Sequence, residues 1–305
     1  MIPIMPDVRW RKLLPGQVCE VCVIDATSKK VRVVHRSAHT VFEAPNWTSD
    51  GEWLIVNAAG SLYRIHTAGD GGPERIPLGP LTDINNDHVL SPNGNTIYVS
   101  SEGDGHLYAA PISGGRPVRI SEERPGPFGY FVLGISTDGS TLAFTGADKR
   151  GGRNFVSNLY TMPSAGGVSQ QLTDADVDSV GGAFSPAGDW LYFNSELASS
   201  RRGHAQVFRM RPDGSGIQQL TNDERVNWFP KPSPDDEWVV YLSFPPGTVG
   251  HEANVQVLLK AMKQDGSQKR TLLALFGGQG TMNVSSWAPD GRRFAFVRYP
   301  TKGQR

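Results

Sequence analysis

Cysteine and long apolar runs are both scarce in this chain, and charge of neither sign prevails. Only two cysteines occur among the 305 residues, and no apolar run approaches the roughly 18 residues that a transmembrane helix needs. Lys plus Arg and Asp plus Glu both number 30, so no net field draws the chain to nucleic acid or to an acidic membrane. Residues Met1–Asp7 lack the basic and apolar segments of a signal peptide. We therefore expect a cytoplasmic protein that neither binds nucleic acid nor inserts into a membrane, or a periplasmic one if an export signal was removed.

The two cysteines lie three residues apart, at Cys19 and Cys22, in a stretch that continues with Val23 and Ile24. This composition is typical of a β-strand. Residues i and i+3 of a strand point to opposite faces, which is poor geometry for a disulfide or a shared metal ion. We therefore expect two structural thiols.

One ten-residue pattern dominates the sequence. It reads FSPAGDWLYF at residues 184–193 and WAPDGRRFAF at residues 287–296, and six copies occur in all. Taking the turn glycine as a marker, with an aspartate in the fifth copy, the copies fall at Gly51, Gly94, Gly139, Gly188, Asp236 and Gly291. The differences between successive markers are 43, 45, 49, 48 and 55 residues, a spacing typical of one four-stranded propeller blade.

The chemistry of the pattern predicts a hairpin at each copy. Proline ends one strand because it cannot donate to a continuing ladder, and Asp-Gly or Asn-Gly forms a tight turn. A third strand, a glycine turn and a short fourth strand follow in most copies. The sixth copy ends at Tyr299 without them, whereas Val21–Ile24 and Val31–Val34 form such a pair with no hairpin before it. We predict an all-β, six-bladed propeller with four antiparallel strands per blade. The N-terminal strands complete the last blade, residues 1–18 form an extension, and residues 19–305 form one propeller domain.

These six repeats resemble the TolB-like β-propeller over residues 20–300. The resemblance implies a stand-alone relative that lacks the N-terminal α/β domain of periplasmic TolB proteins, whose partners lie at the outer membrane. Propellers of related repeat also accompany prolyl oligopeptidases and form the oligogalacturonate lyases, which hold a metal ion with histidines in the channel. The resemblance alone does not choose among these functions.

Candidate functional residues are expected on the propeller face that carries the long loops, since loops on a rigid scaffold often carry function. The irregular loop 243–254 and the residues before the fifth inner strand are predicted to meet at the channel mouth, and a histidine arrives there from the second blade. Trp228 would offer a flat apolar surface to a sugar ring. The alternative is that Trp228 packs between blades and His251 is a solvated loop residue. The candidate ligand-binding residues are Asn86, His88, Glu196, Asn227, Trp228, His251 and Glu252.

The same residues leave several functions open. The first is binding of a saccharide, an anionic small molecule or a protein partner, with the basic loops 148–153 and 199–204 attracting negative charge. The second is a saccharide- or uronate-acting lyase with His88 or His251 as the base. A divalent metal would assist there, although no histidine pair has tight ligand spacing and no ligand set is assigned. The third is a protein-interaction scaffold in a Tol-like envelope or transport system. The sequence specifies no oligomeric state.

Overall fold

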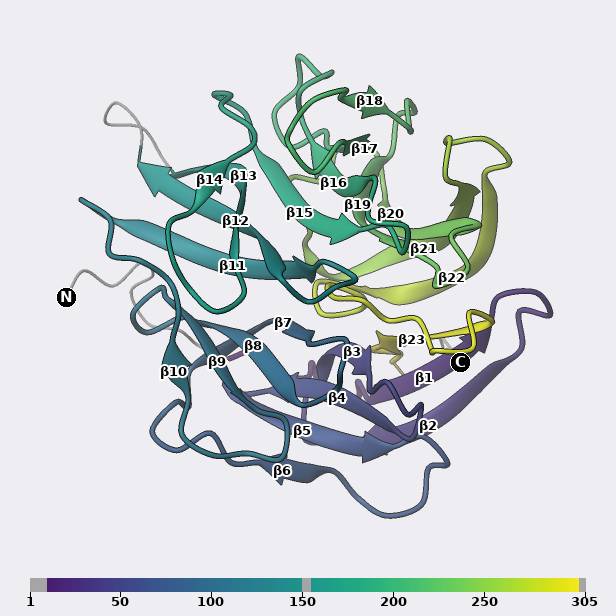
Figure 1. Cartoon of the computed structure of the whole chain (residues 1–305). Coiled ribbons are helices and arrows are strands. Elements are labelled where there is room, and N and C mark those ends of the chain that lie inside the picture. The colour runs from purple at the N-terminus through teal and green to yellow at the C-terminus, as the bar shows by residue number, and fades with distance from the viewer. Residues whose placement is uncertain (1–9, 150–154, 302–305) are drawn as a thin grey trace.

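The computed structural model describes residues 10–149 and 155–301, and this part of the chain folds into β-sheets arranged around a ring (Figure 1). Five sheets have four strands in consecutive order, all antiparallel, and the sixth joins the two ends of the chain. No helix in the described part is long and apolar enough to cross a membrane. The predicted six-bladed, all-β propeller is therefore confirmed.

Blades one to five each begin with the strand closest to the ring's centre and add strands outward. The inner strands are β3 (Glu43–Trp47), β7 (Ile84–Leu90), β11 (Phe128–Ile135), β15 (Ser179–Phe184) and β19 (Val226–Pro232). The second strands are β4 (Trp53–Ala58), β8 (Thr96–Ser101), β12 (Thr141–Lys149), β16 (Leu191–Ser195) and β20 (Trp238–Phe244). The third strands are β5 (Ser61–His66), β9 (Leu107–Pro111), β13 (Phe155–Pro163), β17 (Gln206–Met210) and β21 (Ala253–Lys263). The outer strands are β6 (Glu74–Ile76), β10 (Val118–Arg119), β14 (Gln170–Gln171), β18 (Gln218–Gln219) and β22 (Arg270–Gly278).

Blade six is assembled from both ends of the chain. Strand β1 (Cys19–Asp25) pairs with β2 (Val31–Ser37) on one side and with β23 (Arg293–Arg298) on the other. Figure 1 shows the yellow β23 beside the purple β1. An isolated bridge between Trp287 and Phe294 continues the sheet toward the centre. The predicted closure by the N-terminal strands is therefore confirmed.

The repeated Ser-Pro-Asp-Gly turn is held by its own first side chain. In the fourth copy, Trp190 N donates to Ser185 Oγ at 3.0 Å, and Ser185 Oγ donates to Asp189 Oδ1 at 3.1 Å. Gly188 N bonds Ser185 O at 2.9 Å with a φ of 78°, a left-handed conformation that favours glycine. The repeated serine is thus a structural element of the hairpin.

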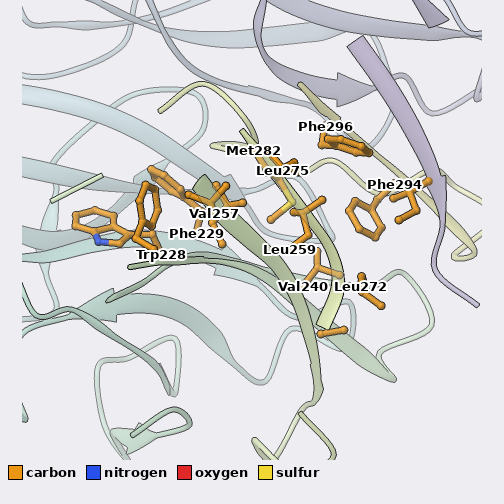
Figure 2. Packing of buried hydrophobic residues seen from close by; sticks show 14 of the residues in the cluster. Trp228, Phe229, Val240, Val257, Leu259, Leu272, Leu275, Met282, Phe294 and Phe296 are labelled. Carbon is orange, nitrogen blue, oxygen red and sulfur yellow. The ribbon is translucent and has the colours of Figure 1, made fainter. Parts of the chain in front are cut away.

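Apolar side chains between neighbouring blades form the core. Figure 2 shows the largest described cluster, which runs from Trp228 and Phe229 of blade five to Phe294 and Phe296 of blade six. Both cysteines are buried and free, and burial raises the pKa of each thiol to about 12. The prediction of two structural thiols is therefore confirmed. A fully buried aromatic side chain stabilises the fold by about 1.5–3 kcal/mol, so these inter-blade contacts keep the inner strands rigid.

Candidate functional site

The inner strands depart from regular pairing at the level of the central channel. Two residues of β3 lie opposite one residue of β4, between the pairs Glu43↔Asn57 and Asn46↔Ile55. Strand β19 has the same irregularity between Trp228 and Lys231, and β7 has a larger one between Ile84 and His88. Bulges of this kind re-aim side chains and are common beside functional sites.

Two of these bulges contain a non-glycine residue in the left-handed region. The φ of Ala44 is 53° in blade one, and the φ of Phe229 is 56° in blade five. Such a conformation costs an L-residue about 1–2 kcal/mol. Strain of this size persists only where the surrounding structure imposes it, and it gathers at functional sites. The residues that flank these positions are therefore candidates for a functional site.

The central polar pair, Asp87 and Lys231, comes from opposite sides of the ring. Asp87 lies on β7 of blade two and Lys231 on β19 of blade five, yet the Asp87 carboxylate acts on the Lys231 ammonium. Their exposed fractions are only 9% and 1%. Burial raises the pKa of Asp87 to about 7 and lowers the pKa of Lys231 to about 8, because each charged form loses hydration. The carboxylates of Glu102 and Glu43 also raise the pKa of Asp87, whereas the Lys231 charge partly offsets that rise. The Asp87 charge in turn partly offsets the fall in the pKa of Lys231.

The Lys231 ammonium has no direct partner among the described residues. No acceptor there lies within hydrogen-bonding distance of Nζ, and no carboxylate forms an ion pair with it. Asp87 is better supplied, because Asn85 Nδ2 donates to its Oδ2 at 3.4 Å and Asn283 also hydrogen-bonds the carboxylate. A buried ammonium is costly unless it is paired. The channel thus holds one ammonium group without a direct acceptor among the described residues, in the field of the Asp87 carboxyl group.

The N-terminal extension contributes a second cation near the same end of the channel. Arg11 donates to Gln279 O at 2.7 Å and to Asn254 Oδ1 at 2.9 Å, and its guanidinium lies 3.8 Å from the centre of the Tyr299 ring. It also lies 3.5 Å from Glu43 Oε1. Burial raises the pKa of Glu43, and Arg11 partly counters that rise. In contrast with the Lys231 ammonium, the Arg11 guanidinium is therefore bound through both terminal nitrogens, and only its Nε has no partner among the described residues.

Trp228 and His251 lie in contact with each other. Their ring centres are 4.6 Å apart in an edge-to-face arrangement, and Phe229 lies 5.2 Å from the imidazole. Trp228 is buried in the cluster between blades five and six, and His251 is half-buried at the end of its loop. Burial lowers the pKa of His251, which favours the neutral imidazole. The His251 ring thus packs against aromatic side chains of the cluster between blades five and six.

His88 and Asn86 lie inside strand β7 rather than in the connection before it, where the sequence placed them. The difference arises because the bulge lets the strand begin earlier, at Ile84. His88 is fully buried, and burial lowers its pKa to about 4, so the ring is neutral near pH 7. Both residues flank Asp87 in the chain.

The other predicted residues are spread over blades four and five. Asn227 Nδ2 donates to Gln206 Oε1 at 3.1 Å and to Asp223 Oδ1 at 3.0 Å, so its amide holds the loop that enters β19. Glu196 is buried, and burial raises the pKa of its carboxyl group, whereas Glu252 is exposed. Within residues 10–149 and 155–301, no three His, Cys, Asp or Glu side chains are grouped so that they could hold a metal ion.

The two basic loops lie in blades three and four. In the loop predicted at 148–153, residues 150–153 lie outside the described part of the chain. In the loop 199–204, Arg201 donates to Glu224 Oε2 at 3.0 Å and contacts the His204 ring. The charge of Arg201 is thus partly neutralised at the surface.

Sequence reasoning did not single out Asp87 and Lys231, although one signal was available for the lysine. Counted back from the turn marker, the fifth residue in the other five copies is small, apolar or uncharged: Asn46, Val89, Gly134, Ala183 and Ser286. Lys231 is the one charged residue in that column. A charge at an inner, buried position of a repeat is a sign of a local polar site.

Comparison with known proteins agrees with the architecture. The family profile of the TolB beta propeller domain matches residues 131–305. An uncharacterized protein of Agrobacterium fabrum is 38% identical over 280 residues, covering 91% of each chain. A protein of Agrobacterium tumefaciens designated a candidate TolB has a solved structure with a TM-score of 0.84 and 36% identity, covering 93% of this chain and 99% of that one.

More distant structures share the fold alone. TolB from Acinetobacter baumannii is 18% identical with a TM-score of 0.61, and the match covers 87% of this chain and 65% of that one. An oligogalacturonate lyase in complex with manganese is 11% identical with a TM-score of 0.54, and the match covers 88% of this chain and 73% of that one.

Proposed function

The chain belongs to the TolB β-propeller family, and from that premise we propose that it is a binding protein whose central channel holds a small anionic ligand, with an acidic saccharide as the favoured class. The observation that carries the proposal is the buried Lys231 ammonium, which has no partner among the described residues. The carboxylate of a uronic acid would supply the missing acceptor.

The opposite wall of the channel suits the remainder of such a ligand. Asp87 can accept hydrogen bonds from sugar hydroxyl groups, and Asn85 and Asn283 hold its carboxylate in place. Its separation from Lys231 leaves the two charges without a direct contact, so a bound molecule can bridge them. Charge-assisted hydrogen bonds to a ligand in such a buried setting are stronger than neutral ones.

The site favours binding over catalysis. The two histidines proposed as bases lie in different places, since His88 is enclosed in β7 and His251 packs on aromatic rings of blade five. A metal-dependent lyase remains a prediction with its own readout, namely turnover of a uronate polymer in the presence of added manganese. A protein partner that presents an acidic side chain would use the same Lys231 and would compete with the small ligand.

Isothermal titration with D-galacturonate tests the proposal, with D-galactose as the uncharged comparison. We expect galacturonate to bind, and galactose to bind at least about tenfold more weakly because it lacks the anionic group. Lys231→Met and Asp87→Asn should each weaken galacturonate binding by a similar factor. Lys260→Met is a matched control, because Lys260 is largely buried on β21 but already lies 3.7 Å from Asp223 Oδ2.

Two results would contradict the proposal. One is equal affinity for galacturonate and galactose, which would mean that the Lys231 ammonium does not contribute to binding of the carboxylate. The other is galacturonate binding that survives Lys231→Met and is lost in Lys260→Met, which would place the anion elsewhere.

A further inference from the structure

The end of the channel at the face of the Ser-Pro-Asp-Gly turns is built from one apolar residue per blade. Each lies four positions before the turn marker, at the end of its inner strand or of the equivalent bridge in blade six. We call this set the apolar ring: Trp47, Leu90, Ile135, Phe184, Pro232 and Trp287. Because the position repeats in every blade, the ring surrounds the channel axis.

The apolar ring lines a cavity of about 450 Å³. The cavity receives residues from all six blades, and Pro92, Pro186 and Pro234 of the turns form part of its rim. No charged side chain is among the described residues that line it. Volumes of 300–1,000 Å³ with mainly apolar walls are typical of small-molecule sites.

The polar groups of the cavity wall that have no partner among the described residues lie on one side. Asn46 and Ser49 come from blade one and Ser285 from the adjacent blade six. Asn46 is 5% exposed and donates its amide to His88 O at 3.4 Å, while its Oδ1 has no partner among the described residues. Ser91, Ser136 and Thr137 of blades two and three also line the cavity, but their hydroxyl groups already donate to Asn93, Asp138 and Pro186. The polar groups that remain available to a ligand therefore lie along blades six and one.

The walls are held in place before any ligand arrives. Trp287 Nε1 donates to Lys231 O at 3.1 Å, which fixes the indole. Thr137 Oγ1 donates to Pro186 O at 2.8 Å, which ties the rim of blade three to that of blade four. A preformed site loses less conformational entropy when it binds a ligand.

We propose that this cavity is a second binding site, for a small uncharged molecule with an apolar body and one hydrogen-bonding end. The apolar body lies against Leu90, Ile135 and Phe184, and the polar end meets Asn46 and Ser49. A charged ligand is disfavoured because it would lose hydration with no counter-charge in the wall. The site opens on the face opposite the long loops. The side chains of Asp87 and Lys231 do not line it, and only the Lys231 carbonyl takes part, by holding Trp287. The proposal therefore does not rest on the function proposed above.

A fluorescence titration with the neutral probe N-phenyl-1-naphthylamine tests the proposal on the intact protein. We expect saturable binding of one probe per chain, unaffected by salt and not displaced by D-galacturonate. Ile135→Lys places a charge in the half-buried wall, and Thr137→Trp fills the mouth from the exposed rim. Each should weaken probe binding by about tenfold or more. Val118→Lys is the matched control, because Val118 is 63% exposed on the outer strand β10.

Three outcomes would overturn the proposal. The first is the absence of saturable binding up to the solubility of the probe. The second is equal affinity in Thr137→Trp, Val118→Lys and the unmodified protein, with denaturant midpoints that show all three to be folded although Thr137→Trp removes the bond to Pro186 O. The third is a dimer by light scattering that Ile135→Lys converts to a monomer, which would mean that a second copy covers the cavity.

Discussion

Replacing Lys231 with methionine should change how stability depends on pH in a defined window. Burial lowers the pKa of Lys231 from 10.5 to about 8 in the folded state. The unfolded chain therefore binds more protons at this site between these two values, and stability rises with pH there. Below pH 8 both states are protonated and the full cost of the buried charge is present, about 3 kcal/mol from a difference of roughly 2.5 pKa units. Above pH 10.5 that cost is gone.

Lys231→Met should therefore be more stable than the unmodified protein at pH 8 and lose this advantage as the pH rises to 10.5. The loss should be about 3 kcal/mol. Asp87 adds to this loss. Without the Lys231 cation the pKa of Asp87 rises further, so its ionisation destabilises Lys231→Met over a wider range of pH than it does the unmodified protein. The buried tyrosines titrate in both proteins and largely cancel in the difference between them.

Urea or guanidinium unfolding at half-unit intervals from pH 7 to pH 10.5 measures this difference. Lys263→Met is a control at the surface, where Lys263 lies 3.1 Å from Glu237 Oε2, and shows what the loss of a partly exposed lysine does at each pH. Parallel stability profiles for Lys231→Met and the unmodified protein would refute the reasoning, because they would show that Lys231 keeps an ordinary protonation equilibrium in the folded state.

The turn geometry leads to two further predictions. Ser185→Ala removes the hydroxyl group that accepts from Trp190 N and donates to Asp189. We expect the free energy of unfolding, measured by denaturant titration, to fall by about 1–2 kcal/mol. An unchanged midpoint would show that water replaces the hydroxyl group. Asp236 has a φ of 60° at the position where the other five copies have glycine. Asp236→Gly should therefore raise the melting temperature, and the free energy of unfolding by up to about 1 kcal/mol, whereas the reverse change Gly188→Asp should lower both. A gain in stability from Gly188→Asp would contradict this account.

The architecture could be predicted from the sequence because each blade carries its own copy of the turn residues. Six copies of one hairpin at regular spacing leave few other folds, and the unmatched strands at Val21–Ile24 and Val31–Val34 account for the closure. The proximity of Trp228 and His251 could be inferred as well, because a loop and the start of an inner strand in the same blade must lie close together.

The polar section of the channel could not be inferred in the same way. It depends on bulges at Ala44 and Phe229, and neither alanine nor phenylalanine is a residue type that predicts a left-handed conformation. A shift of one residue in a strand sends the following side chains to the other face. The electrostatic interaction of Asp87 with Lys231, which lies 144 positions later in the chain (231 − 87), is therefore a property of the closed ring.

The way in which the ring closes also sets when a newly made chain can finish folding. Strand β23 leaves the ribosome after every other strand, so β1 must wait with one edge unpaired while the other blades form. Buried Glu20 on β1 shares this delay, because one of its two arginines, Arg36, is made early, whereas Arg298 is made in the last strand. A chain that stops before β23 keeps both an open sheet edge and a half-paired carboxylate. Unpaired edges of this kind invite aggregation, so the pairing of β23 with β1 removes a hazard that lasts until the ring closes.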